Sequence, residues 1–144
     1  MTDTWYGKSM SQHEITTFLT EQATGVLALS KERRAYGIPM SFAWDEESEH
    51  AIMDFGFAEE SKKREFIETT DEACLTVYEW NSPTEWRSVV VTGSLQQLDE
   101  DEVDDEIVAW YYEVARDIDV PSGNVELEWY GLQAEVVSGV ALYE

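Results

Sequence analysis

The chain has 144 residues and a formal charge of −22, because 31 residues are acidic and only 9 are basic. A hydrophobic content of 43% with six Trp and seven Tyr excludes a disordered acidic tail, since disordered segments contain few aromatic residues. Binding to nucleic acid or to an anionic membrane is excluded as well, because both depend on Lys and Arg side chains that neutralise phosphates.

The first part of the chain predicts one helix followed by three strands. Residues 11–14 have the spacing of a capping box before apolar residues at helical intervals, which predicts a helix over about 11–22. The next three segments are strand-like runs, at 25–29, 36–44 and 51–57. Pro39 lies inside the second run. Because proline cannot donate to a β-ladder, it marks an edge, a bulge or a backbone that faces a ligand.

The second part of the chain predicts two helices between further strands. Ser61 can cap a short helix that ends near Thr69, and residues 99–117 predict a longer helix whose acidic first turns suit the helix dipole. The remaining strands are predicted at 73–80, 86–98, 125–134 and, less distinctly, 136–142. Short connections require antiparallel pairing, and closure removes exposed edges. We therefore expect one domain over 1–144, mainly β with α: a six-stranded antiparallel barrel with about three helices.

The density of carboxylates indicates where the protein works. A surface this acidic, with only four Lys, is typical of molar salt, where the Debye length falls to about 3 Å. The alternative is an acidic protein that works at low salt. Cys74 is expected to be a buried small hydrophobe. Without a visible signal peptide or an apolar run of about 18 residues, a cytoplasmic protein is expected.

Six of the nine basic residues form two short clusters: Lys31, Arg33, Arg34 and Lys62, Lys63, Arg64. In a chain that repels anions, a phosphate site needs such a concentration of positive charge. Lys62 and Lys63 fall in the first turn of a predicted helix, where cations oppose the dipole unless an anion binds there with the Ser61 hydroxyl. The alternative is that the two lysines pair with neighbouring glutamates. Two histidines are too few for a metal site or a histidine relay.

Four segments, taken in order, resemble the pyridoxamine 5'-phosphate oxidase-like split-barrel flavoproteins. They are Gly25 to Ala28, Arg34 to Phe42, Ser61 to Lys63 and Trp86 to Gly93. The resemblance covers about residues 15–98 and is nearest to the short branch with nitroimidazole-resistance-type proteins. It implies a six-stranded split β-barrel that forms a homodimer and binds FMN in clefts between the subunits.

The resemblance also implies which residues would bind the cofactor: Arg34, Tyr36, Pro39, Met40, Ser41, Phe42, Ser61, Lys62, Lys63, Trp86, Ser88 and Val89. Residues 39–42 would line the isoalloxazine through the backbone of the second strand, Lys62 and Lys63 would hold the phosphate, and Ser88 and Val89 would contribute from the fifth strand. Tyr36, Trp44 and Trp86 are candidates to stack near the flavin. No catalytic residue is assigned, because the flavin itself would carry the electrons.

Three functional hypotheses follow. The first is an FMN-binding oxidoreductase with an unknown small-molecule substrate; the others are an F420-binding reductase on the same fold and a non-catalytic flavin-binding or storage module. Residues 54–57 lack the histidine that nitroimidazole-type proteins often have after the third strand. The C-terminal segment lacks the Arg and Trp of true pyridoxamine phosphate oxidases. The resemblance therefore carries neither nitro-group reduction nor vitamin B6 oxidation to this chain.

Overall fold

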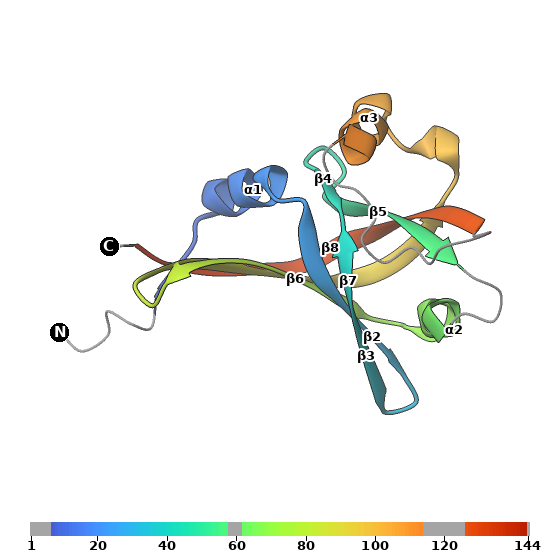
Figure 1. Ribbon diagram of the computed structural model, residues 1–144, viewed down its shortest axis with the longest axis horizontal. Coiled ribbons are helices and arrows are strands. Elements are labelled where there is room, and N and C mark those ends of the chain that lie inside the picture. Colours follow the sequence, from blue (N-terminus) through green and yellow to red (C-terminus); the bar gives the residue numbers. More distant parts are fainter. Residues whose placement is uncertain (1–6, 58–61, 114–125, 144) are drawn as a thin grey trace.

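A computed structural model describes residues 7–57, 62–113 and 126–143. The fold is a strongly curved antiparallel sheet with three α-helices packed around it (Figure 1). The strands are β1 (Lys8–Ser9), β2 (Thr24–Lys31), β3 (Arg34–Ser41), β4 (Ala43–Asp45), β5 (His50–Phe57), β6 (Ala73–Ser82), β7 (Glu85–Leu98) and β8 (Glu126–Leu142). The helices are α1 (Gln12–Glu21), α2 (Lys62–Thr69) and α3 (Asp105–Glu113), and a 3₁₀ turn, η1, covers Glu100–Glu102.

The sheet order is β3-β2-β6-β7-β8-β5-β4, and β1 adds to β8. β3 and β4 form the two ends of this order although only Phe42 separates them in the chain, so the sheet curves until its two edges meet at that residue. Phe42 is fully buried, and its N–H donates to the carbonyl of Ala23 at 3.0 Å. The expected six-stranded closed barrel is thus corrected: the described residues form eight strands in a sheet that no ladder closes.

The core lies on the concave side of the sheet, where alternate strand residues face inward. Leu27, Leu75 and Val91 occupy one register row across β2, β6 and β7, and all three are fully buried. Phe18 of α1 and Phe66 of α2 complete this core from the helices. Along β2, exposed residues alternate with buried or half-buried ones, as expected of a strand with one face on the core.

The helix predicted at the N-terminal end is confirmed, with its cap. The Ser11 hydroxyl accepts from the N–H of Glu14 at 3.1 Å, and the Glu14 carboxylate accepts from the N–H of Ser11 at 2.9 Å. These two bonds satisfy backbone donors that the first turn of a helix leaves free. Phe18 and Leu19 of α1 are buried in the core of the sheet. Figure 1 shows the helix lying beside the sheet.

Two boundaries in the C-terminal part differ from the prediction. The helix expected over 99–117 is divided, because Glu102 returns a capping bond to Asp99 and the Asp104 carboxylate accepts from Glu106 to begin α3. Its predicted last four residues lie outside the described residues. The two strands expected at the end are one strand, β8, whose register against β7 shifts at Gly93. None of the described helices has both the length and the apolar character needed to cross a bilayer.

Candidate anion-binding site

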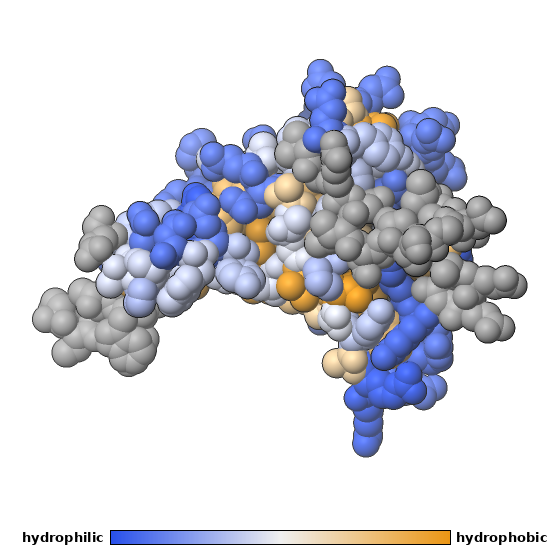
Figure 2. All heavy atoms as spheres, in the orientation of Figure 1, coloured by the Kyte–Doolittle hydropathy of each residue, from blue (hydrophilic) through white to orange (hydrophobic). Residues whose placement is uncertain are grey.

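Three basic side chains from separate parts of the chain converge beside α2. Lys31 ends β2 and Arg34 begins β3, and the two are directly paired across the β2–β3 hairpin. The Nζ of Lys62 lies 4.8 Å from the ring centroid of Tyr36, and the guanidinium of Arg34 lies 5.5 Å from that of Phe66. We call Lys31, Arg34 and Lys62 the basic cluster. It sits at the hydrophilic hairpin that projects from the molecule (Figure 2).

The hairpin that presents this cluster has an unfavourable local conformation. Its turn residues Glu32 and Arg33 have φ of 51° and 75°, a left-handed region that costs a residue other than glycine roughly 1–2 kcal/mol. The closing pair, Lys31 opposite Arg34, places like charges face to face, which is also destabilising. Such features persist where the surroundings offset them. A negative charge beside the closing pair would offset the repulsion between its two cations.

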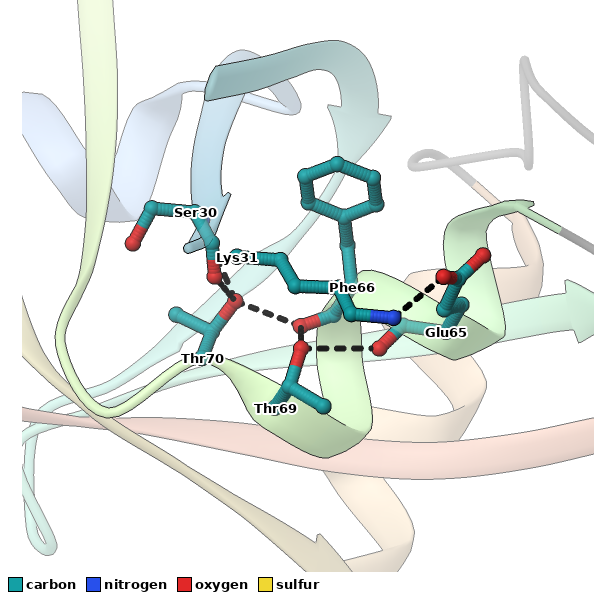
Figure 3. A network of polar contacts seen from close by, with 6 residues as sticks. All are labelled: Ser30, Lys31, Glu65, Phe66, Thr69 and Thr70. Carbon is teal, nitrogen blue, oxygen red and sulfur yellow. Dashed lines mark hydrogen bonds and ion pairs between the residues drawn. The ribbon is translucent and has the colours of Figure 1, made fainter. Parts of the chain in front are cut away.

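Glu65 of α2 supplies one such charge. Its carboxylate forms an ion pair with the ammonium of Lys31 (Figure 3). The hydrogen bond from Lys31 and the charge of that residue lower the pKa of Glu65 most, and the charges of Arg34 and Lys62 lower it further. The charges of all three cations of the cluster therefore act on the Glu65 carboxylate. The Glu65 side chain is 49% exposed, so this carboxylate is open to solvent.

A hydrogen-bonded clasp holds the hairpin against α2. The hydroxyl of Thr70, just after the helix, accepts from the N–H of Ser30 at 3.2 Å and lies 3.0 Å from the Ser30 carbonyl oxygen. The same hydroxyl contacts the Phe66 carbonyl in the last turn of the helix (Figure 3). The backbones that carry Lys31 and Glu65 are thereby fixed relative to each other, so the cluster is assembled before any ligand arrives.

The other two basic residues of α2 point away from the cluster. Lys63 is only 5% exposed, and its ammonium donates to the carbonyl of Gly56 at 3.1 Å. Arg64 pairs with Glu128 at 2.7 Å, and its guanidinium lies over the ring of Phe57. Of the residues predicted to hold a phosphate, the structure thus brings Lys62 to the cluster and turns Lys63 inward. Ser61 lies outside the described residues.

The predicted ring-binding residues on β3 divide between its two faces. Met40, Ser41 and Phe42 are buried, with Met40 and Phe42 in the core, whereas Pro39 is exposed. Within the described residues β3 pairs only with β2, so Pro39 lies on an edge strand, one of the three alternatives that its sequence position allowed. From a single subunit, a ligand at this edge would reach Pro39 and strand backbone but not the side chains of Met40 or Phe42.

Pro39 borders a shallow cavity of about 310 Å³ on the convex side of the sheet. Its other lining residues are Thr24, Gly25, Val26 and Tyr78. Ser88 is paired with Tyr78, and Trp86 is paired with Trp80, so two of the predicted fifth-strand residues lie on this same side. Val89, the third, is fully buried on the other side.

The cavity is part of a wider surface without charge. The outward residues of β2, β6, β7 and the end of β8 form this uncharged face, namely Val26, Ala28, Cys74, Thr76, Tyr78, Trp80, Trp86, Ser88, Val90, Thr92, Val136, Ser138, Val140 and Leu142. None of them is Asp, Glu, Lys, Arg or His, although 28% of the chain is charged. Tyr78, Trp80 and Val136 are 60–63% exposed. A contiguous exposed surface of this kind is typical of an interaction site.

A larger cleft, of about 620 Å³, lies between α1 and β8 but has the wrong charge for an anion. Trp44 and Ile15 contribute apolar surface to it, and Glu46, Glu49 and Glu135 add carboxylates. Trp44 lines this cleft and not the cavity at Pro39. Within the described ranges no group of three or more His, Cys, Asp or Glu side chains could hold a metal ion.

Sequence reasoning identified the two basic clusters but not how they combine. Arg33 and Arg34 are neighbours in sequence, yet Arg34 rather than Arg33 acts on Glu65. Arg87, a further basic residue in the segment Trp86 to Gly93, pairs with Glu79 at 2.6 Å and packs over Phe18. Only one feature of the sequence indicated that Lys31 and Lys62 lie in the same basic cluster: the acidic chain has few other cations.

Comparison with known proteins places this fold in a family. The family model described as pyridoxamine 5'-phosphate oxidase matches residues 11–139. No curated protein matches the sequence. Among solved structures, an FAD-binding protein from Mesorhizobium loti is 22% identical with a TM-score of 0.70, covering 95% of this chain and 97% of that one.

Two further structures share the fold at lower identity. The FAD binding protein from Mycobacterium smegmatis is 13% identical with a TM-score of 0.65, over 94% of this chain and 98% of that one. A protein named as a candidate for 5-nitroimidazole antibiotic resistance, from Bacteroides thetaiotaomicron, is 12% identical with a TM-score of 0.64, over 94% and 89%. These likenesses show the fold. Because the family model spans most of the sequence, the chain belongs to the pyridoxamine 5'-phosphate oxidase family.

Proposed function

We propose that this protein is an FMN-binding oxidoreductase whose basic cluster holds the cofactor's phosphate and whose substrate is a small molecule of unknown identity. The observation that carries the proposal is that Lys31, Arg34 and Lys62 gather beside α2, in ion-pair or ring contact with Glu65, Phe66 and Tyr36, in a chain with a charge of −22. Membership of the family and the solved structures named as FAD-binding support a flavin. FMN, when bound, would supply the electron transfer.

The residues present fit a phosphate ester of a flat heterocycle. Two like charges paired across the β2–β3 hairpin, with a third beside them, make a cradle that is unfavourable when it holds no anion. Pro39 is five residues from Arg34, which at about 3.3 Å per residue is roughly 16 Å along β3. The cavity at Pro39 is uncharged. The site thus has a charged end and an uncharged end, joined by the free edge of β3.

The proposed ligand would cross that edge, because the two ends lie on opposite faces of the strand. Arg34 and Tyr36 face the side that α2 covers, and Pro39 faces the convex side. An edge strand offers N–H and C=O groups that its single neighbour leaves unpaired. Backbone contacts at residues 37–41 would therefore orient the ring, while the buried Met40 and Phe42 keep the strand rigid.

We further propose that two copies of the chain pair through the uncharged face. Two molecules with a charge of −22 repel each other, so close approach favours the surface without carboxylates. Tyr78 and Trp80 are exposed there, and aromatic residues are enriched at the centres of protein interfaces. The cavity at Pro39 opens on this face, so a second copy would complete its walls.

The distribution of basic residues favours FMN over F420 as the cofactor. Within the described residues Lys63, Arg64 and Arg87 contact groups of their own chain, which leaves few cations outside the basic cluster for the long anionic tail of F420. We also propose that the protein works at high salt, since its carboxylate density would strain a compact fold at low ionic strength.

Identification of the chromophore tests the proposed function. The protein is purified in molar KCl, its absorption spectrum is recorded, and any ligand is released by acid and identified by chromatography. We expect FMN in a ratio near one per subunit, and reduction of the bound flavin by a nicotinamide donor. Recovery of F420 would replace FMN in the proposal. A flavin that no donor reduces would favour the storage module instead.

A further inference from the structure

Glu65 occupies the place that the phosphate would take in the proposed function. Its carboxylate is ion-paired with Lys31, so it links the hairpin to α2 (Figure 3). The Arg34 guanidinium and the Lys62 ammonium both lie against the ring of the neighbouring Phe66, at 5.5 and 5.8 Å from its centroid, and their charges help to lower the pKa of Glu65. A ligand anion that uses all three cations must therefore compete with a carboxylate that belongs to the chain.

We propose, on the basis of the proposed function, that Glu65 is an internal competitor that a phosphate monoester displaces from Lys31. A carboxylate carries one negative charge, whereas a phosphate monoester carries about 1.5 to 2 at pH 7 and has three acceptor oxygens. Because Glu65 is tethered to the site, its effective concentration is on the order of millimolar or higher. A ligand carboxylate present below that concentration would only replace one carboxylate by another, without a gain in binding free energy. Glu65 thus sets a threshold that phosphate monoesters pass and carboxylates do not.

The geometry allows this exchange without a change in the fold. Glu65 is about half exposed, so its side chain can rotate into solvent. The Thr70 clasp holds the backbone of the hairpin against α2, so only the side chain needs to move. Glu68, one turn further along α2, provides a comparison, because its carboxylate lies 4.0 Å from Arg64, which is outside the basic cluster.

The first test compares Glu65→Gln with Glu68→Gln, which change the net charge equally. FMN and inorganic phosphate are titrated into the full chain at about 0.1 M ionic strength, where the Debye length is about 10 Å. Removing an exposed ion pair that competes with the ligand should tighten binding about two- to fivefold in Glu65→Gln, from the usual strength of such pairs. Glu68→Gln should bind as the wild type does. Unchanged or weaker binding by Glu65→Gln would overturn the proposal.

The second test follows the side chain itself. The chemical shift of the Glu65 carboxyl carbon is followed by NMR at pH 7, where phosphate carries more than one negative charge, without ligand and with saturating inorganic phosphate. Displacement from Lys31 should move this resonance toward that of an unpaired glutamate carboxylate. An unmoved resonance with phosphate bound means that the ion pair persists, and the proposal is then wrong.

The two tests separate this inference from the proposed function. If neither Lys62→Met nor Arg34→Gln weakens FMN binding, the proposed cofactor site fails, but the phosphate titration of Glu65 still decides whether this carboxylate is displaced. If both variants weaken FMN binding and Glu65→Gln does not tighten it, the cofactor site stands and the competitor does not.

Discussion

Replacing each of the two adjacent lysines by methionine should separate cofactor binding from stability. Lys62 is exposed and belongs to the basic cluster, whereas Lys63 is 5% exposed and donates to the Gly56 carbonyl. In water-like dielectric, a unit charge about 4 Å from a phosphate of charge about −1.5 to −2 contributes roughly 1.5–2 kcal/mol. Lys62→Met should therefore weaken FMN binding about 10- to 30-fold at low salt.

Lys63→Met should act on the fold instead. It removes a charged donor from a buried carbonyl, which costs about 1–3 kcal/mol of unfolding free energy, whereas Lys62→Met should change stability by less than about 0.5 kcal/mol. Flavin fluorescence quenching gives the dissociation constants, and urea denaturation gives the stabilities. The reasoning is refuted if Lys63→Met costs more cofactor affinity than Lys62→Met, or if Lys62→Met is the more unstable protein.

Four further predictions concern assembly, packing, pH and salt. Trp80→Glu should convert a dimer to a monomer by light scattering, whereas Tyr143→Glu, an equally drastic change outside the uncharged face, should not; a wild-type monomer would contradict the proposed pairing. Gly93→Ala should cost several kcal/mol of unfolding free energy, because its Cβ would lie 1.8 Å from the Gln133 carbonyl oxygen and β7 and β8 would have to separate. A loss below about 1 kcal/mol would mean that the backbone at this register shift can move aside at little cost. The pKa values of Glu14 and Glu65 are lowered, so each carboxylate stabilises the fold above its ordinary pKa of 4.5, and this contribution is lost as the pH falls below 4.5. Replacing both residues by Gln should therefore make the free energy of unfolding less dependent on pH in the acid range. An unchanged slope would argue against both contacts. Raising KCl from about 0.1 to 2 M should raise the Tm continuously if carboxylate repulsion limits stability, and a flat profile would remove the high-salt proposal.

Local patterns predicted most of the elements correctly. The capping box at residues 11–14 and the strand-like runs at 25–29, 73–80 and 86–98 are short-range signals, and the corresponding helix and strands are present. The helix expected over 99–117 failed for a reason that is also local. Asp99 and Asp104 can each cap a separate start, so a dense run of acids divides the segment instead of extending one helix.

The remaining features depend on distances that the sequence does not reveal. Whether the barrel closes depends on Phe42. This residue is buried and donates to the Ala23 carbonyl, and so it interrupts the chain between β3 and β4 where a continuous strand was expected. Likewise, Lys62 and Lys63 are equivalent in sequence, and only the position of β5 decides that Lys63 points inward to Gly56. The pairing of Lys31 with Glu65 depends on how the hairpin packs against α2, which no spacing along the chain indicates.

The central claim is that the basic cluster holds the phosphate of a flavin, and a comparison of FMN with riboflavin tests it most directly. Riboflavin lacks the phosphate and is otherwise the same ligand. The dissociation constants of both are measured for the wild type and for a variant with Lys31→Gln, Arg34→Gln and Lys62→Gln. We expect FMN to bind the wild type far more tightly than riboflavin and this preference to vanish in the variant. An equal preference in both proteins would contradict the account, because the phosphate would then be held elsewhere.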